Sequence, residues 1–350
     1  MKLKNYIRTH LKDFEAYSSA RDDFKSCGKV FLDANESPNN NGLNRYPDNQ
    51  SSRLTTLLAK DLQLSKQQLL VCNGSDEALD LCIRTICEPK EDKLLYFSPS
   101  YGMYNVLARC NNVDSIEASL NQDFQIELDK LEELLISEPV KLIVLCNPNN
   151  PTGNLLNVKA VLNLASQYEC FVLVDEAYIE FCPSKSSIPL LEQYDNLLIS
   201  RTFSKAYGLA GIRIGYCIGS EPIITALSKI QLPYSVSTLS QSIAEDAVQN
   251  KSYMLAQVRS TVLERERLSS TLQDFNFVRQ VYPSESNFLL FQVEDAKAVY
   301  QYLIQQGIII RNRDQQAQNC LRVSVGNSKE NECLINALKQ YEKEKSTVLR

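Results

Sequence analysis

Four largely apolar segments restrict the fold of this chain more than any other feature of its sequence. They span residues 93–97, 141–146, 170–174 and 196–199, and each is apolar at successive positions rather than at alternate ones. Such runs are expected of strands that are buried on both faces of a mostly parallel sheet. Helical patterns separate them, for instance around residues 128–136 and 158–168. This order predicts an α/β fold with a doubly wound, mostly parallel sheet in a large domain.

The pattern changes after residue 275, where strands at 288–293, 307–310 and 320–325 alternate with two helices. We therefore expect three regions: an N-terminal arm with part of a smaller domain (1–50), the large domain (51–272) and a small C-terminal α+β domain (273–350). We also expect a short strand beginning at residue 30. A single helical stretch is predicted over residues 237–272, with residues 264–267 on its exposed side.

Composition excludes several classes of function. With 350 residues, 44% of them hydrophobic, the chain can bury a large core, and its net charge of -5 without a basic block argues against a nucleic-acid partner. No stretch has the length of a membrane span or the pattern of a signal peptide, so we expect a cytoplasmic protein. The 11 cysteines lie mostly in apolar runs and the only histidine is His10, a pattern of reduced thiols without a metal site.

Chemically active side chains follow the predicted strands. Tyr101 comes after the first, Asn150 after the second, Asp175 and Tyr178 after the third, and Lys205 after the fourth. Open α/β sheets bind ligands at the carboxyl ends of their strands. The sequence therefore predicts that an aromatic ring, an amide, a carboxylate, a phenol and a lysine lie along one edge of the sheet.

The surroundings of Lys205 suit a carbonyl cofactor that carries a phosphate. The amine would form a Schiff base, while hydroxyls, an arginine and the free N–H groups at the start of a helix would hold the phosphate. The predicted phosphate-binding residues are Gly74, Ser75, Asp76, Thr202, Ser204 and Arg213. Each group alone has an ordinary explanation, such as a surface lysine or a helix cap. Their joint occurrence at strand ends favours the cofactor.

A pyridoxal cofactor explains the remaining groups. Asp175 would keep the pyridine nitrogen protonated, Tyr178 and Asn150 would donate to the ring oxygen, and Tyr101 would stack on the ring. We therefore expect pyridoxal 5'-phosphate as the cofactor, and we assign catalytic roles to Lys205, Asp175 and Tyr178.

With these residues placed, the sequence resembles the fold type I pyridoxal-phosphate aminotransferases, and within them the histidinol-phosphate aminotransferases, along nearly the whole chain. The Asn-Pro-Thr-Gly motif at 150–153, Asp-x-x-Tyr at 175–178 and Ser-Lys at 204–205 are shared by the superfamily. Ala-Asn-Glu at 34–36, Asn-Arg-Tyr-Pro at 44–47 and the full segment 175–181 are closer to the subfamily.

The resemblance implies a homodimer in which Tyr46 reaches the cofactor phosphate of the partner subunit. It implies substrate contacts from Tyr17, Asn35, Arg311 and Arg322. Arg313 is an alternative to Arg311, so the assignment of the substrate anion stays open. The implied reaction transfers an amino group from L-histidinol phosphate to 2-oxoglutarate by a ping-pong route, and gives imidazole-acetol phosphate and L-glutamate, as in histidine biosynthesis.

Three other functions remain open at this stage: an aromatic or broad-specificity aminotransferase, a pyridoxal-phosphate decarboxylase of a phosphorylated amino acid, and a non-catalytic cofactor-binding regulator. The cofactor residues cannot separate a transaminase from a decarboxylase, because the bond that breaks depends on which bond at Cα stands perpendicular to the ring. Amino-group exchange with 2-oxoglutarate would discriminate between them.

Overall fold

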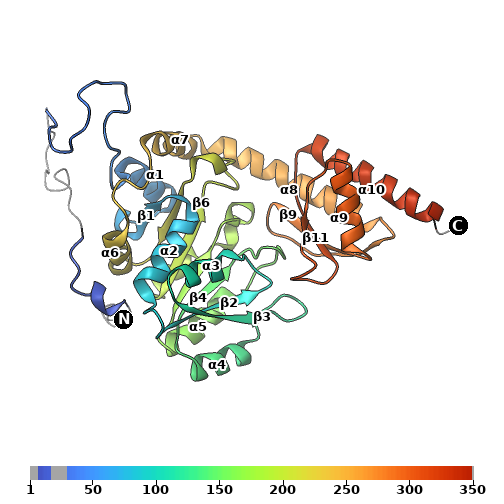
Figure 1. The fold of residues 1–350 in the computed structure, drawn as a ribbon, viewed down its shortest axis with the longest axis horizontal. Helices are drawn as coiled ribbons and strands as arrows, with labels where there is room; N and C mark the ends of the chain where they lie inside the picture. The colour runs from blue at the N-terminus through green and yellow to red at the C-terminus, as the bar shows by residue number, and fades with distance from the viewer. Residues whose placement is uncertain (1–6, 17–29, 349–350) are drawn as a thin grey trace.

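The computed structural model describes residues 7–16 and 30–348 of the chain. A larger N-terminal part and a smaller C-terminal part are connected by the long helix α8 (Lys251–Gln273), which Figure 1 shows running from one to the other. Within the described ranges, no helix is both long enough and apolar enough to cross a membrane.

The large part is built on a seven-stranded sheet with the order β1-β7-β6-β5-β4-β2-β3. Its strands are β1 (Leu69–Cys72), β2 (Lys93–Ser98), β3 (Asp114–Ser119), β4 (Val140–Cys146), β5 (Phe171–Asp175), β6 (Leu197–Thr202) and β7 (Gly215–Ile218). Only β7 runs antiparallel to its neighbours, β1 and β6. The mostly parallel sheet expected from the sequence is therefore confirmed.

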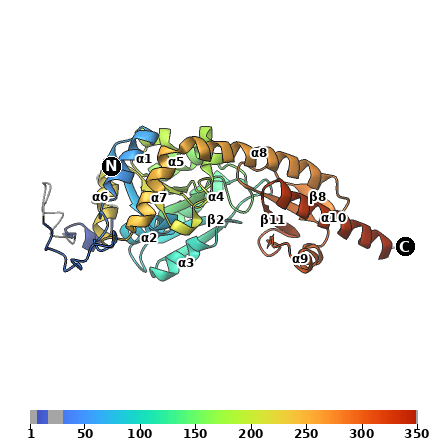
Figure 2. The same cartoon turned by 90° about the horizontal axis from the view of Figure 1, so that it is seen from above.

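Helices cover both faces of this sheet, as Figure 2 shows for α5 and α3. They are α1 (Ser52–Leu62), α2 (Gly74–Ile86), α3 (Met103–Cys110), α4 (Leu128–Ser137), α5 (Val158–Gln167), α6 (Glu221–Ile230) and α7 (Thr238–Gln249). One core packs under α1, α4, α5 and α7 and includes Ile143; the other packs under α2, α3 and α6 and includes Leu142. Successive strand residues thus enter opposite cores, which explains why the strands are apolar at every position.

The smaller part is a four-stranded antiparallel sheet with the order β10-β11-β9-β8, packed on helices. Its elements are β8 (Val278–Val281), β9 (Phe288–Val293), α9 (Ala296–Gln305), β10 (Arg311–Asn312), β11 (Cys320–Ser324) and α10 (Ser328–Val348). The end of α8 contributes Leu268 and Leu272 to this core. The beginning of α8 places Met254 and Val258 against Tyr178 and Phe288, so the helix contacts both parts.

Four sequence-based expectations are wrong in detail. No strand begins at residue 30, where Leu32 is 91% exposed and pairs with no neighbouring strand. The stretch 237–272 is two helices, because Asn250 leaves the helical conformation with ψ near 33°. Arg265 is buried and donates to the carbonyl of Ser286 over 3.0 Å, so 264–267 is not wholly exposed. Gly307 turns at a φ of 74°, and the next strand begins only at residue 311.

A buried ion pair ties the ends of β5 and β6 together. The Nη2 of Arg201 lies 2.7 Å from Oε2 of Glu176, and the two side chains are 8% and 0% exposed. The Nε of Arg201 also donates to Oε2, over 3.0 Å. Because Glu176 follows the last residue of β5 and Arg201 precedes the last residue of β6, the pair fixes the two strand ends relative to each other.

We predict that Glu176→Ala lowers the free energy of unfolding by about 3–5 kcal/mol, because it leaves the buried Arg201 guanidinium without its carboxylate. Urea unfolding followed by circular dichroism measures the change. Lys130→Ala is the matched control: its 2.7 Å pair with Glu127 is exposed, so losing it should change the free energy of unfolding much less than Glu176→Ala does. Equal losses in the two variants would contradict a supporting role for the buried pair.

Candidate active site

A cavity of about 400 Å³ lies at the carboxyl ends of the parallel strands, between the two parts of the chain. Most of the residues singled out in the sequence meet here. The lining comprises Ser75, Asp76, Tyr101, Cys146, Asn150, Asp175, Ala177, Tyr178, Thr202, Ser204, Lys205, Ala210, Arg213, Arg311, Arg313 and Arg322. Five of these side chains are cationic and two are carboxylates, so the cavity favours anionic ligands.

The register of the sheet accounts for this convergence. Cys146 at the end of β4 pairs with Asp175 at the end of β5, and Asp175 pairs with Ser200 near the end of β6. Because the three strands are parallel and adjacent, the loops that follow them open on the same edge. Residues that are about 30 positions apart in the sequence therefore become neighbours.

The start of α2 and the loop after β6 form a phosphate-sized recess. Gly74 has a φ of 80°, and a Cβ there would lie 2.5 Å from Nη2 of Arg213. A Cβ on Gly215 would collide with the backbone nitrogen of Ser75. These two glycines let the guanidinium and β7 approach the first turn of the helix. The N–H groups of that turn can then face an anion together with Arg213.

Two hydroxyls complete the recess. The Thr202 hydroxyl donates to Oγ of Ser204 over 3.0 Å, and Nη1 of Arg213 donates to the same oxygen over 3.3 Å. Hydroxyls and a guanidinium in one cluster are donors suited to phosphate oxygens. The predicted phosphate-binding residues are thus held together by the protein itself.

Asp175 is a buried carboxylate with two hydroxyl donors. Tyr104 donates to its Oδ2 over 3.0 Å and Ser200 to its Oδ1 over 3.1 Å. Burial raises the pKa of Asp175 to about 6, and these two hydrogen bonds only partly oppose the rise. A cationic ring nitrogen at this carboxylate would restore its charged form.

Sequence reasoning missed Tyr104 and Ser200. Tyr104 lies three residues after Tyr101, and helix α3 brings its hydroxyl to Asp175. Ser200 is the register partner of Asp175 on the next strand. A signal for Ser200 existed in the order of the strands, whereas Tyr104 could be placed only by the packing of α3.

Lys205 lies deep enough in the cavity for its charge to be destabilised. Burial lowers its pKa, and the nearby Arg322 lowers it further. Its Nζ is 5.6 Å from the centre of the Tyr178 ring. A larger neutral fraction makes the amine a better nucleophile and a better base.

A chain of hydrogen bonds joins the C-terminal part of the protein to this site. Arg322 donates through Nη1 to Oδ1 of Asn150, and Nδ2 of Asn150 donates to the Tyr178 hydroxyl over 3.3 Å. Burial raises the pKa of Tyr178, so its phenol stays protonated and can donate to a ligand. Phe288 packs against both Tyr178 and Arg322 and holds the chain in place.

Tyr101 supplies an aromatic wall. Its ring meets that of Tyr104 edge to face, with 5.6 Å between the centroids, and its hydroxyl donates to Oδ1 of Asp76 over 3.4 Å. Burial raises its pKa to about 12. The ring is thereby fixed at the cavity wall, where a planar ligand can stack on it.

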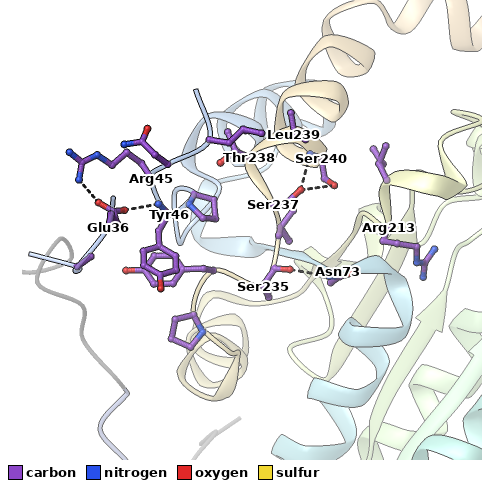
Figure 3. A pocket seen from close by; sticks show the side chains of 18 of the residues that line it. Glu36, Arg45, Tyr46, Asn73, Arg213, Ser235, Ser237, Thr238, Leu239 and Ser240 are labelled. Atoms are coloured by element: carbon purple, nitrogen blue, oxygen red, sulfur yellow. Dashed lines mark hydrogen bonds and ion pairs between the residues drawn. The ribbon is translucent and has the colours of Figure 1, made fainter. Parts of the chain in front are cut away.

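Tyr46 and Asn35, which were also predicted to lie at the site, do not line this cavity. Tyr46 and Asn35 line a second cavity of about 900 Å³ that shares Arg213 with the first, and Figure 3 shows Tyr46 and Arg213 on opposite sides of it. Tyr46 is 51% exposed and stacks on Tyr234 with 4.7 Å between the ring centroids. Tyr17 lies outside the described residues. We place the chemistry in the smaller cavity, because the larger one has no lysine.

The residues of the smaller cavity fit pyridoxal phosphate. The recess at Gly74 and Arg213 matches a phosphate, Asp175 matches a ring nitrogen, and Lys205 matches the carbonyl carbon. The cavity thus contains each type of group that this cofactor requires, contributed by residues that are far apart in the sequence.

We predict that Asp175 makes the ligand-free protein less stable as the pH rises from about 4 to about 6. Its folded pKa of about 6 exceeds its usual 3.8, so the folded state binds more protons in this range. The stability of the wild type relative to Asp175→Asn should therefore fall by an amount on the order of 3 kcal/mol over this range. Urea unfolding of both proteins at pH 4, 5, 6 and 7 measures it, and parallel pH profiles would contradict the assignment.

Comparison with known proteins identifies the family. Residues 17–338 match the sequence model of the aminotransferase class I and II family. The curated histidinol-phosphate aminotransferase of Flavobacterium johnsoniae is 44% identical over 342 residues, which cover 96% of this chain and 98% of that protein.

Solved structures agree with the sequence match. The histidinol-phosphate aminotransferase of Clostridium acetobutylicum has a TM-score of 0.80 at 26% identity, over 87% of this chain and 92% of the other. That of Sinorhizobium meliloti, solved in complex with pyridoxal-5'-phosphate, has a TM-score of 0.78 at 25% identity, over 86% of this chain and 83% of the other. The chain therefore belongs to the aminotransferase class I and II family and, within it, to the histidinol-phosphate aminotransferases.

Proposed function

We propose that this protein transfers the amino group of L-histidinol phosphate to 2-oxoglutarate, with pyridoxal phosphate as the cofactor, in histidine biosynthesis. The observation that carries the proposal is the cavity that holds Lys205 and Asp175 on one side and three arginines on the other. A phosphorylated amine and a dicarboxylic keto acid both bring an anion to a group of guanidiniums. Relatives of the same name that match over nearly the whole chain support it.

The cofactor, when bound, supplies a carbonyl group for the substrate amine and a ring that withdraws electrons from the substrate Cα. The protein residues do the rest. The amine of Lys205, whose pKa is lowered by burial, would take the proton from the substrate Cα and deliver it to the former carbonyl carbon of the cofactor, and it would move a proton in the opposite direction in the second half-reaction. Asp175 would keep a proton on the ring nitrogen, and the hydroxyls of Tyr104 and Ser200 fix the orientation of its carboxylate.

Other residues position the ring. Tyr178 would donate its phenolic hydrogen to the ring oxygen, and Asn150 holds that phenol in place. Tyr101, which Tyr104 holds at the cavity wall, would cover one face of the ring and exclude water from it. Because both half-reactions use this one cavity, the two substrates must bind in turn, which gives a ping-pong route.

We predict that L-histidinol phosphate converts the cofactor-loaded protein in a single turnover about 100-fold faster than L-histidine or L-phenylalanine at equal concentration. The reason is that a phosphate monoester, with close to two negative charges and three acceptor oxygens, makes more charged hydrogen bonds with the arginines than a carboxylate does. Stopped-flow absorbance of the cofactor measures the rate, and formation of glutamate from 2-oxoglutarate measures the exchange.

Lys205→Ala provides the control for this experiment. It should lose the half-reaction by several orders of magnitude, and borohydride should no longer fix the cofactor to the chain, as mass spectrometry would show. Release of CO₂ without glutamate would indicate the alternative decarboxylase. Equal rates with phenylalanine would indicate a broad-specificity aminotransferase.

A homodimer is also part of the proposal. Helices α7 and α8 carry apolar side chains that solvent reaches in the single chain: Leu239, Ile243, Tyr253, Leu255 and Leu263. Such a surface is typical of a subunit interface. Leu239 also lines the second cavity, together with Tyr46 and Arg213. Burial of this surface by a second copy would bring the partner subunit's Tyr46 toward the phosphate recess.

We also propose the cytoplasm as the compartment, which the free thiols of the ten described cysteines favour.

We predict that mixing Tyr46→Ala with Lys205→Ala, under conditions that exchange subunits, restores up to about a quarter of the wild-type activity. A mixed dimer has one site with both residues intact. Tyr46→Ala alone should lose about 10- to 100-fold, the worth of one charge-assisted hydrogen bond, and Tyr46→Phe should behave likewise. Transaminase assays before and after exchange, with native mass spectrometry of the mixed dimer, give the measurement. Proven exchange without recovery would mean that Tyr46 serves its own chain.

A further inference from the structure

Three arginines of the C-terminal sheet share one face that borders the active-site cavity. Arg311 on β10 lies directly opposite Arg322 on β11. Arg313 comes two residues after Arg311, and its N–H donates to the carbonyl of Cys320 over 2.9 Å, which continues the antiparallel ladder. Since alternate residues of a strand point to the same face, all three guanidiniums are presented to the cavity that they line.

The three arginines differ in their hydrogen-bond partners and in their burial. Arg322 donates to Asn150 and lowers the pKa of Lys205 beyond the effect of burial, which places it beside the reacting amine. Arg311 is exposed, so solvent screens its charge. Arg313 is partly buried, and its only side-chain hydrogen-bond partner among the described residues is Gln316, which accepts from Nη1 over 3.0 Å.

Arg313 has an unmet donor, and so does Arg322. In the part of the chain that the structure describes, the Nε atoms of both are buried and have no hydrogen-bond acceptor. Burial, Arg322 and Arg311 together lower the pKa of Arg313 to about 10. A partly buried guanidinium with no carboxylate partner among the described residues, next to two like charges, is costly unless an anion binds there.

The anionic groups of the two substrates indicate which of them binds at Arg313. Glutamate carries one carboxylate carbon bonded directly to Cα and a second one three bonds from Cα. The phosphorus of histidinol phosphate is also three bonds from Cα. A phosphate monoester carries close to two negative charges at pH 7 and has three acceptor oxygens. Its charge and number of acceptor oxygens suit a second guanidinium, one strand beyond Arg322.

We propose that Arg313 is a specificity residue that binds the phosphate of the amino donor, while Arg322 serves both substrates. This inference rests on the proposed function and deepens it. Arg313 presents Nε and one Nη as a fork toward the phosphate oxygens, a geometry that a lysine cannot reproduce. Each carboxylate of glutamate has one charge and two acceptor oxygens, so the residue contributes less to the glutamate half-reaction.

The test compares Arg313→Gln and Arg313→Lys with the wild type, all as cofactor-loaded proteins. Arg313→Gln should lower kcat/KM for L-histidinol phosphate about 10- to 100-fold, mainly through KM, and change kcat/KM for L-glutamate less than about 3-fold. Arg313→Lys keeps the charge without the fork, and should fall between the two. Gln316→Ala is the matched control: it removes the partner of Arg313 but leaves the guanidinium, so both substrates should stay within about 2-fold.

Inorganic phosphate provides a second, non-catalytic readout. Calorimetric titration of the cofactor-loaded proteins should show binding that weakens about 10-fold or more in Arg313→Gln and is unchanged in Gln316→Ala. Equal losses for both substrates, or unchanged phosphate binding, would overturn the assignment of Arg313. If the wild type fails to transaminate histidinol phosphate, the proposed function fails, and the phosphate titration still decides whether Arg313 is an anion-binding residue.

Discussion

The concentration of positive charge in one cavity is the constraint on which the site depends. Lys205, Arg213 and three arginines of the C-terminal sheet face only two carboxylates, Asp76 and Asp175. Like charges at this spacing repel one another, and burial adds the cost of lost hydration. The sheet holds them together nonetheless, because their backbones belong to strands and loops that the two cores fix. A phosphate-bearing cofactor and an anionic substrate both reduce this repulsion, so ligand binding and stability are coupled.

The site also joins the two parts of the molecule. The large part contributes the lysine, the buried carboxylate and the phosphate recess, while the C-terminal part contributes Arg322 and its neighbours. The hydrogen bonds from Arg322 through Asn150 to Tyr178 cross this boundary. Helix α8 packs against both parts, and its first turns contact Tyr178 and Phe288 at the boundary between them.

Sequence reasoning placed a reactive side chain most successfully where that residue directly follows a strand. Asp175 and Lys205 could be placed at a common edge, because consecutive parallel strands deliver their following loops to one side. Sequence reasoning failed where the direction of a side chain depends on the packing of a helix. Tyr104 arrives from the face of a helix, and Arg265 turns inward from a stretch that reads as charged and solvated. A side chain's direction in such cases depends on packing partners far along the chain.

The sequence alone determined the α/β architecture, most of the strands of the parallel sheet, and the candidate cofactor residues. These follow from local properties: apolar runs, turn residues and the position of reactive groups after strands. Only the tertiary structure decided the break at Asn250, the environment of Asp175 and the placement of Arg313 beside Arg322. Burial and the approach of charges from different strands are sums over the whole fold, and no short segment contains them.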